Sequence, residues 1–381
     1  MVGELQAQFR KCFGREPEVI ARAPGRLEIL GNHTDYNEGV TLSCAVDLGT
    51  YIAVAKCPGN QVELDDIKFP GRKRFSLSPL PEPEKGEWTN YIRGVIQAIR
   101  RRGHEIGAFQ GLVTTELPLS SGMSSSAALE IAAAYALGEL FGIELPPEEW
   151  AKVGQDAENN YVGANTGLLD QFSSIFGRTN QLVFTDFRSL EVRHCPTPEG
   201  ISIIVANSGV KHDLTAEYNE RRQSCEEAAR LLGVKALRDV SMSDLQAARE
   251  ELPDLVYRRA LHVVGENERV YRAMEAMAKK DLETFGRLVD ESHESSRTNF
   301  ENSCPELDQL IEIGRTLPGY IGARLSGGGF GGISIHFVHS DKAQEYGQRL
   351  KTAFAKLSGQ EDPQVMCCNI GQGAQILCSN R

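Results

Sequence analysis

The chain has 381 residues, of which 41% are hydrophobic and 24% are charged, a composition typical of a globular protein with about two domains. Its formal net charge of −11 argues against a surface that binds nucleic acid or anionic lipid, so an anion would have to be held by a local field. The nine cysteines are odd in number and lack the paired spacing of a metal site, which predicts idle thiols in a reducing cytosol.

The sequence pattern predicts strands first and a mixture of strands and helices later. Apolar stretches are too short or too charged to span a bilayer, and the first residues lack the apolar core of a signal peptide, so a cytoplasmic protein is expected. Strands are expected at 18–24, 40–46, 50–57, 61–67, 109–117, 181–187, 189–195, 201–209, 320–326, 331–338, 364–371 and 373–378. Helices are expected at 88–102, 124–142, 147–163 and 217–233, in a mainly helical block at 242–316, and after residue 340.

The clearest linker in the middle of the chain is PTPEG at 196–200. We therefore predict two lobes, a β-rich lobe at 1–196 and an α+β lobe at 197–381. Clefts between lobes are favoured ligand sites. The fold class expected is α+β, with a ligand cleft between the lobes.

Residues 118–128, PLSSGMSSSAA, lead into an alanine-rich helix. Gly122 allows a tight turn, and the following serines would lie where backbone N–H groups lack helical partners. Such amides and the helix dipole can hold a phosphate, and a serine hydroxyl there can ligate magnesium. A plain serine N-cap explains the stretch as well, so both interpretations stay open at this point. No Walker loop is present.

Residues 23–39, APGRLEILGNHTDYNEG, bring together five polar groups that could recognise sugar hydroxyls. The glycines in this span predict a loop rather than a core element. His33 or Asp35 considered alone would be interpreted as a hydrogen-bonding partner for a turn, but five such groups together make that interpretation less favoured. The five are Arg26, Asn32, His33, Asp35 and Tyr36.

Two further stretches contain candidate functional groups. In residues 157–177 Asp170 follows an apolar Gly-Leu-Leu, so its carboxylate is either a helix N-cap or, facing a phosphate cleft, a proton acceptor. Glu158 lies on the preceding helix. The loop ARLSGGGFGG at 323–332 would let backbone approach a ligand closely, although a hinge is nearly as good an account.

Together these stretches resemble the GHMP small-molecule kinase superfamily and, within it, the galactokinase family. GRLEILGNHTDYNEG is similar to the signature G-R-V-N-[LI]-[IL]-G-E-H-T-D-Y-N-x-G, and PLSSGMSSSAA to the nucleotide-binding motif P-x-x-x-G-L-[SG]-S-S-A. ARLSGGGFGG resembles the third motif and GANTGLLDQFSS the stretch with the catalytic aspartate. The motifs occur in the expected order between about Ala23 and Phe337.

The resemblance implies a ribosomal-S5-like lobe, a ferredoxin-like lobe, and a cleft that takes ATP, Mg²⁺ and a sugar. It further implies the transfer of phosphate from MgATP to the anomeric hydroxyl of galactose. We also expect a monomer and, from the net charge, no nucleic-acid or membrane partner. The implied catalytic residues are Asp170, beside the reacting hydroxyl, and Arg26, which would lower its pKa and neutralise charge. The implied sugar-binding residues are Asn32, His33, Asp35, Gly167 and Tyr218. The implied ATP-binding residues are Trp88, Tyr91, Gly122, Met123, Ser124, Ser125 and Ser126, and Ser126 with Glu158 would hold the metal.

Two departures from the family pattern stand out. Asn32 replaces the usual glutamate, which puts the preference at C6 of the sugar in doubt because a carboxylate there would be repelled less. Thr166-Gly167 and Leu169 replace a cysteine-glycine pair and a methionine, with little change in volume. A kinase for galacturonate, N-acetylgalactosamine or arabinose is therefore one alternative. An inactive sugar sensor is another, although the intact Ser124–Ala128 segment favours an enzyme.

Overall fold

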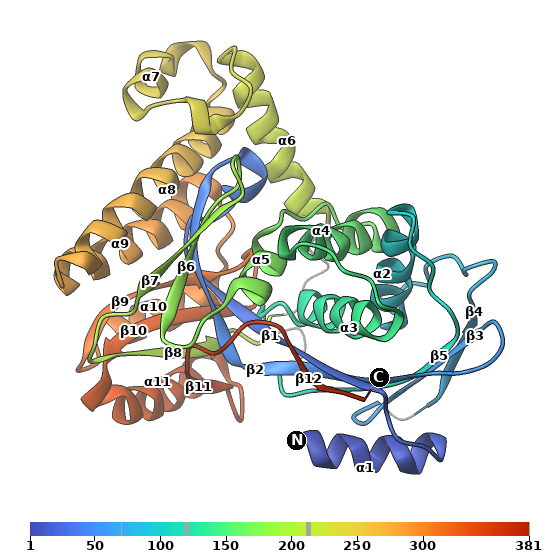
Figure 1. Ribbon diagram of the computed structural model, residues 1–381. Coiled ribbons are helices and arrows are strands. Elements are labelled where there is room, and N and C mark those ends of the chain that lie inside the picture. The colour runs from blue at the N-terminus through green and yellow to red at the C-terminus, as the bar shows by residue number, and fades with distance from the viewer. Residues whose placement is uncertain (70, 119–121, 211–214, 381) are drawn as a thin grey trace.

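The computed structural model describes residues 1–69, 71–118, 122–210 and 215–380. Two sheets organise the chain, each covered by helices (Figure 1). In the described residues no helix is long and apolar enough to cross a membrane. All nine cysteines are free thiols.

The first sheet has the order β12-β1-β2-β5-β3-β4, with a β6–β7 hairpin attached to β2. All its pairs are antiparallel except β3 with β5. The 17-residue strand β2 is its centre, since it pairs with β1, β5 and β6. The strands are β1 (Val19–Leu30), β2 (Val40–Lys56), β3 (Gln61–Asp66), β4 (Lys73–Ser76), β5 (Phe109–Thr115), β6 (Gln181–Asp186), β7 (Glu191–Pro196) and β12 (Gln375–Ser379).

Alternation along β2 gives this sheet two apolar faces. Ile52 and Val54 pack in the core that lies under the helices α2, α3 and α4, whereas Tyr51 and Ala53 pack with Leu5 of α1 on the other face. Figure 1 shows α1 on the opposite side of the sheet from α2 and α3. The helices of this lobe are α1 (Val2–Phe13), α2 (Thr89–Arg101), α3 (Ser125–Phe141), α4 (Pro147–Ala157) and α5 (Leu169–Phe176).

The second sheet is antiparallel, with the order β11-β8-β10-β9. Numbered from its first strand this order is 4-1-3-2, which is the ferredoxin-like arrangement that the resemblance implied. Its elements are β8 (Ile201–Asn207), β9 (Tyr320–Ser326), β10 (Ile333–His339), β11 (Val365–Cys368), α8 (Asp254–Ala278), α9 (Leu282–Ser295), α10 (Pro305–Arg315) and α11 (Ala343–Ser358).

The two lobes share apolar packing. Leu27 of β1 and Leu42 of β2 lie in one core with Val205 of β8 and Phe337 of β10, while α10 and α11 cover the other face of the second sheet. The strand β12 near the C-terminus pairs with β1 in the first sheet. The division of the chain at residue 196 stays a prediction, and the last strand crosses back over it.

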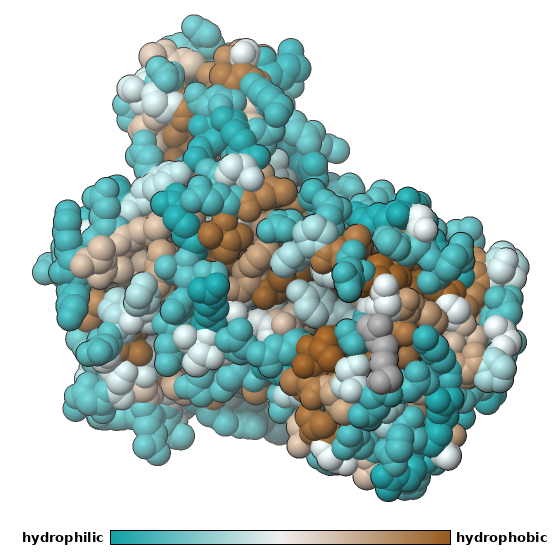
Figure 2. Space-filling view, viewed as in Figure 1, coloured by the Kyte–Doolittle hydropathy of each residue, from teal (hydrophilic) through white to brown (hydrophobic). Residues whose placement is uncertain are grey.

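The helices α6 (Thr215–Leu231) and α7 (Met242–Ala247) project beyond both lobes and pack with α8. Figure 2 shows a mostly hydrophilic face, with hydrophobic side chains gathered in the hollow between this projection and the lobes. The short helical turns are η1 (Asp35–Asn37), η2 (Glu158–Val162), η3 (Leu237–Asp239), η4 (Arg249–Glu251), η5 (Ser296–Phe300) and η6 (Ser340–Lys342).

The structure corrects two expectations about local structure. Residues 23–39 were expected to be a loop, but 23–30 belong to β1, and only the remainder forms a loop with the turn η1. The separate strands expected at 40–46 and 50–57 are one strand, β2. In both cases pairing with a long neighbour supplies hydrogen bonds to segments that contain glycine or proline, and tertiary context overrides local propensity. A register shift between Glu28 and Leu30 accommodates one extra residue near the end of β1.

Candidate active site

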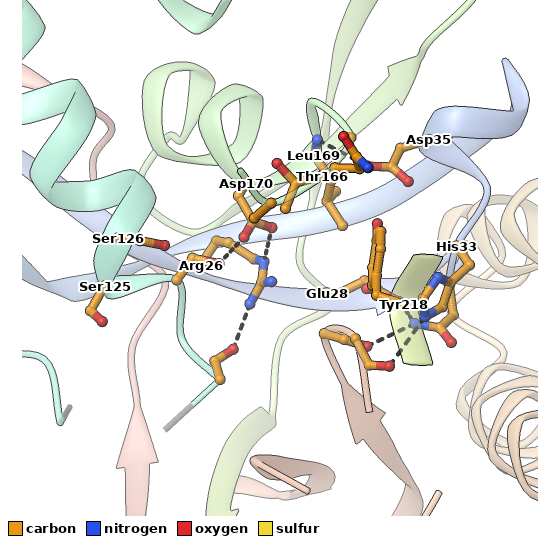
Figure 3. A pocket seen from close by; sticks show the side chains of 18 of the residues that line it. Arg26, Glu28, His33, Asp35, Ser125, Ser126, Thr166, Leu169, Asp170 and Tyr218 are labelled. Carbon is orange, nitrogen blue, oxygen red and sulfur yellow. Dashed lines mark hydrogen bonds and ion pairs between the residues drawn. The ribbon is translucent and has the colours of Figure 1, made fainter. Parts of the chain in front are cut away.

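A cavity of about 330 Å³ lies where β1, the loop at 31–35, the start of α3, the loop before α5, α6 and the glycine-rich loop at 327–332 come together. Figure 3 shows side chains from these distant segments pointing toward one another. A second cavity of about 140 Å³ shares Ser125 and Ser126 with the first. The first turn of α3 therefore lies between two adjacent cavities.

Arg26 and Asp170 form an ion pair at the wall of the larger cavity. Arg26 Nε donates to Asp170 Oδ1 at 2.7 Å, and Arg26 Nη1 donates to the Gly122 carbonyl at 2.6 Å. The Arg26 side chain is 7% exposed and that of Asp170 is 25% exposed. Because Arg26 is tied to two partners, it holds an accessible carboxylate in a fixed orientation (Figure 3).

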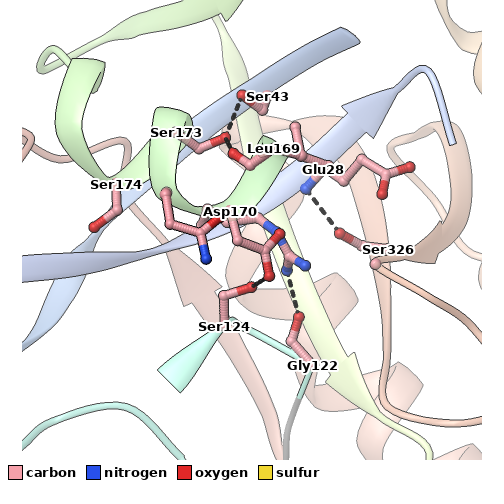
Figure 4. A network of polar contacts seen from close by, with 12 residues as sticks. Glu28, Ser43, Gly122, Ser124, Leu169, Asp170, Ser173, Ser174 and Ser326 are labelled. Carbon is pink, nitrogen blue, oxygen red and sulfur yellow. Dashed lines mark hydrogen bonds and ion pairs between the residues drawn. The ribbon is translucent and has the colours of Figure 1, made fainter. Parts of the chain in front are cut away.

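The entrance to α3 is shaped by two residues with left-handed backbone. Gly122 has φ of 75° and Ser124 has φ of 54°. This turn brings the Ser124 hydroxyl to Asp170 Oδ2, to which it donates a short hydrogen bond (Figure 4). A non-glycine residue in this region is strained, and such strain is found at ligand sites. Residues 119–121 of the serine-rich motif lie outside the described part of the chain.

Ser126 and Glu158, the expected metal ligands, are in contact. Ser126 Oγ donates to Glu158 Oε1 at 3.0 Å, and Thr166 Oγ1 donates to Oε2 at 2.7 Å. Burial raises the pKa of Glu158, and the nearby charge of Asp170 raises it further. The buried Glu130 Oε1 has no hydrogen-bond partner among the residues that the structure describes. The negative charge of Glu130, Glu158 and Asp170 around one guanidinium would be offset by a nearby divalent cation.

Ser126 and Glu158 suit a Mg²⁺ ion that has few protein ligands better than they suit a metal ion enclosed by protein ligands. No group of three or more His, Cys, Asp or Glu side chains with metal-ligand geometry occurs among the residues that the structure describes. Magnesium commonly takes one or two protein oxygens and completes its shell with water and substrate phosphates. One hydroxyl and one carboxylate at the mouth of a helix match that pattern.

The smaller cavity has mainly apolar, partly aromatic walls. Trp88 precedes α2, Tyr91 lies in its first turn, and both line the cavity with Val113 of β5 and Leu129 of α3. Flat apolar walls suit a purine ring, which stacks and buries apolar area. Met123 does not line either cavity, because its side chain packs in the core and its carbonyl accepts from Arg26 N at 3.2 Å.

Asp35 and Gly167 are in close contact at the other end of the larger cavity. A Cβ atom on residue 167 would lie 1.7 Å from Asp35 Oδ2, so glycine is required there. Asp35 Oδ1 accepts from the backbone N–H of Tyr36 at 2.9 Å, and Oδ2 from that of Leu169 at 3.4 Å. Burial raises the pKa of Asp35 to about 6, and the charges of Asp170 and Glu28 add to the rise although the backbone donors oppose it.

His33 and Tyr218 form an aromatic wall beside Asp35. The two rings lie 5.0 Å apart, and His33 also contacts Phe300. His33 Nε2 faces the Gly328 carbonyl at 3.2 Å and Nδ1 faces the Tyr36 hydroxyl at 2.8 Å. Burial lowers the pKa of His33 to about 3, so at neutral pH the ring is uncharged and donates from Nε2.

Asn32 is fully buried and hydrogen-bonded within the protein. Its Nδ2 donates to Glu28 Oε1 and to the Gly327 carbonyl, both at 2.9 Å, and its Oδ1 accepts from Asn302 Nδ2 at 2.9 Å. The amide therefore has no hydrogen left for a ligand. Its role in sugar binding stays a prediction, and these contacts favour an indirect one.

Three charged residues at the site were not expected from the sequence. Glu28 lines the cavity, and Arg324 from the glycine-rich motif pairs with it at 3.0 Å. Glu266 of α8 accepts the backbone N–H groups of Gly31 and Asn32, both at 2.9 Å. A charged residue on the buried side of an apolar helix pattern, such as Glu266 between Val263 and Val270, is the signal that could have identified it.

Comparisons with known proteins agree with this geometry. The family model described as the galactokinase galactose-binding signature matches residues 7–56, and those for the GHMP kinase N-terminal and C-terminal domains match 90–178 and 273–356. A galactokinase from Haemophilus influenzae is 40% identical over 382 residues, covering 99% of each chain. One from Actinobacillus pleuropneumoniae serotype 3 is 40% identical over 94% of this chain and 95% of its own.

Solved structures give the same result at the level of the fold. The crystal structure of Lactococcus lactis galactokinase complexed with galactose matches with a TM-score of 0.94 and 30% identity, covering 99% of this chain and all of that one. Methanococcus jannaschii mevalonate kinase, 18% identical with a TM-score of 0.67 over 94% of this chain and all of its own, shares the fold. The two-lobe GHMP kinase fold is confirmed. The chain belongs to the galactokinase family of GHMP kinases.

Proposed function

We propose that this chain transfers the γ-phosphoryl group of MgATP to the anomeric hydroxyl of α-D-galactose, which yields galactose 1-phosphate and ADP. The observation that carries the proposal is the position of the Arg26–Asp170 pair. The pair lines the polar cavity and contacts Ser124 at the start of α3, whose first-turn residues Ser125 and Ser126 line both this cavity and the aromatic-walled one. A sugar in the first cavity and a nucleotide in the second would place the acceptor hydroxyl and the phosphates on either side of that pair.

The chain's own residues would act mainly by positioning and by charge. Asp170 accepts a hydrogen bond from the sugar O1 hydroxyl and takes its proton as the bond to phosphorus forms. Arg26 holds Asp170 and offsets negative charge during transfer, so no covalent intermediate is needed. Asp35 accepts from two adjacent sugar hydroxyls, which favours one epimer.

The nucleotide would be held at three points. Trp88 and Tyr91 would contact the adenine, and the amides of Gly122, Met123, Ser124 and Ser125 would face the phosphates. Ser126 and Glu158 would hold Mg²⁺, which when bound supplies positive charge to the phosphate oxygens.

An ADP-release assay across hexoses, uronic acids, N-acetyl sugars and pentoses tests the proposal. We expect galactose to give the highest kcat/KM and phosphorus NMR to show an anomeric phosphate. A product phosphorylated at another oxygen, or a higher kcat/KM with a sugar other than galactose, would overturn it.

A further inference from the structure

Glu28 has no part in the mechanism above, although its carboxylate lies in the wall of the sugar cavity. Arg26 and Glu28 are two residues apart in a regular part of β1, so their side chains project from the same face, about 7 Å apart along the strand. In Figure 4 the Glu28 side chain extends away from Asp170. Glu28 therefore lies at the end of the cavity remote from the reacting hydroxyl.

The contacts of Glu28 hold one carboxylate oxygen and leave the other available. Oε1 accepts from Asn32 Nδ2 at 2.9 Å and from Arg324 Nη1 at 3.0 Å. Oε2 accepts no hydrogen bond from any residue in the described ranges. Since it is not one of the fully buried atoms that lack a partner, it is accessible from the cavity. Because two donors fix Oε1, the carboxylate cannot rotate freely and Oε2 keeps one orientation.

Asn32 serves to orient Glu28. Both of its amide hydrogens are donated within the protein, one of them to Glu28. In the galactokinase signature quoted above, asparagine stands at the position of Glu28 and glutamate at the position of Asn32. The two residue types are exchanged in this chain, so the carboxylate stands four positions earlier in the sequence and is not lost.

Charge at the cavity wall also disfavours anionic sugars. The charged residues that line it in the described part of the chain are Glu28, Asp35, Asp170 and Arg26. Arg26 is already paired with Asp170, and Arg324 is fully buried behind Glu28. A second carboxylate brought to this end would face Glu28 without a free cation to balance it.

We propose that Glu28 Oε2 accepts a hydrogen bond from a sugar hydroxyl remote from the reacting O1, and that its charge excludes sugars with a carboxylate at that end. The inference rests on the proposed function, since it assigns a specificity-determining residue to the same site. It reverses the expectation that Asn32 relaxes the discrimination against galacturonate.

The test uses Glu28→Gln in the full-length protein, measured with galactose and galacturonate. A glutamine keeps the shape and can still accept from Asn32 and Arg324, but it presents an amide donor to the cavity. We expect KM for galactose to rise about 10-fold with kcat changed less than about 3-fold, because a charged acceptor is lost from binding alone. The ratio of kcat/KM for galactose over galacturonate should fall about 10-fold or more.

Two further variants separate specificity from damage to the fold. Leu27→Met, a volume-conserving change on the opposite side of β1, should leave KM and the sugar ratio unchanged. The double variant Glu28→Asn/Asn32→Glu restores one carboxylate and should recover KM and the ratio to within about 3-fold of the parent. Thermal unfolding of each variant reports on folding.

The outcomes distinguish the inference from the proposed function. If the parent protein phosphorylates galactose but Glu28→Gln matches Leu27→Met in KM and sugar ratio, the inference fails and the function stands. If the parent releases no ADP with galactose, the function fails. Calorimetric titration of galactose into the parent and Glu28→Gln without nucleotide then still decides whether Glu28 contacts the sugar: equal affinity would reject the contact.

Discussion

The phosphate end and the sugar end of the cleft differ in how their charged groups are balanced. At the phosphate end Glu130 and Glu158 are buried acids whose pKa values are raised by burial and by neighbouring negative charge, with Arg26 committed to Asp170. At the sugar end burial also raises the pKa values of Glu28 and Asp35, but donors inside the protein hold the carboxylates of Glu28 and Glu266 and the side-chain oxygen of Asn32. A bound cation would offset the negative charge at the phosphate end. At the sugar end the side chains are already held in place to bind a neutral ligand.

The largest expected effect comes from replacing Asp170, the proposed proton acceptor. Asp170→Asn keeps the shape of the side chain but removes the proton acceptor, so kcat should fall at least about 10³-fold, while nucleotide affinity changes less than about 3-fold. Steady-state kinetics and a fluorescent-nucleotide titration measure these quantities. Asp156→Asn, which removes a surface carboxylate paired with Arg102, is the control and should keep near-normal kcat. A near-normal kcat for Asp170→Asn would reject the proposed mechanism.

The next effect should be confined to the sugar end. Asp35→Ala removes an acceptor for two hydroxyls, so KM for galactose should rise about 100-fold with a smaller change in kcat. Glu38→Gln at the end of the same loop is a matched control, because Glu38 pairs with Arg188 and Lys235 at the surface. A KM for Asp35→Ala equal to that of the control would show that the sugar binds elsewhere.

A smaller effect is expected from loosening the loop that carries His33 and Asp35. Burial alone would raise the pKa of Glu266, but Arg269, His262, Arg324 and backbone N–H groups hold it well below the usual range. Glu266→Gln leaves Arg269 without its charge partner, so the free energy of unfolding should fall by about 2–4 kcal/mol. KM for galactose should rise about 10-fold because the loop is held less firmly.

Denaturant unfolding and steady-state kinetics together test whether Glu266 both stabilises the fold and positions the loop that carries His33 and Asp35. Glu268→Gln on the exposed side of α8 is the control, and it should change neither quantity. Loss of stability without any change in KM would show that Glu266 supports the fold and does not position the loop.

The smallest effect concerns pH. Asp35 has a pKa of about 6 in the folded chain against 3.8 as its ordinary value, so its ionisation costs folding free energy as the pH rises from about 4 to 6. Asp35→Asn should therefore increase the free energy of unfolding at pH 7 by about 1–3 kcal/mol, with no gain below about pH 4.

Sugar affinity should show the opposite dependence. Because only the carboxylate accepts from two hydroxyls, affinity for galactose should weaken up to about 10-fold between pH 7.5 and pH 5. His33, with a pKa of about 3, does not titrate in this range. Calorimetry across this range with the parent and Asp35→Asn is the measurement. A pH dependence that persists in Asp35→Asn would assign it to another group.

Much of the site could be predicted from the sequence because its motifs are local. The turn at Gly122 and the helix that follows depend on neighbouring residues, and the helix at 124–142 was placed within one residue of each end of α3. The loop expected at residues 23–39 was wrong for 23–30, because pairing with β2 holds that segment in a strand despite its glycine and proline. No local pattern indicates a role for Glu28, because its partner Arg324 lies 296 residues away in the sequence.

By itself the sequence determined which chemical groups are available and which short segments present them, since turn geometry, helix starts and residue types are properties of neighbouring residues. Only the tertiary structure decided which oxygen of Glu28 lacks a donor among the described residues, that both Asn32 amide hydrogens are donated within the protein, and that Glu266 holds the backbone of Gly31 and Asn32. Those outcomes depend on donors brought together by packing of the two lobes, and hydrogen-bond partners are assigned by distances of a few tenths of an ångström that no local pattern encodes.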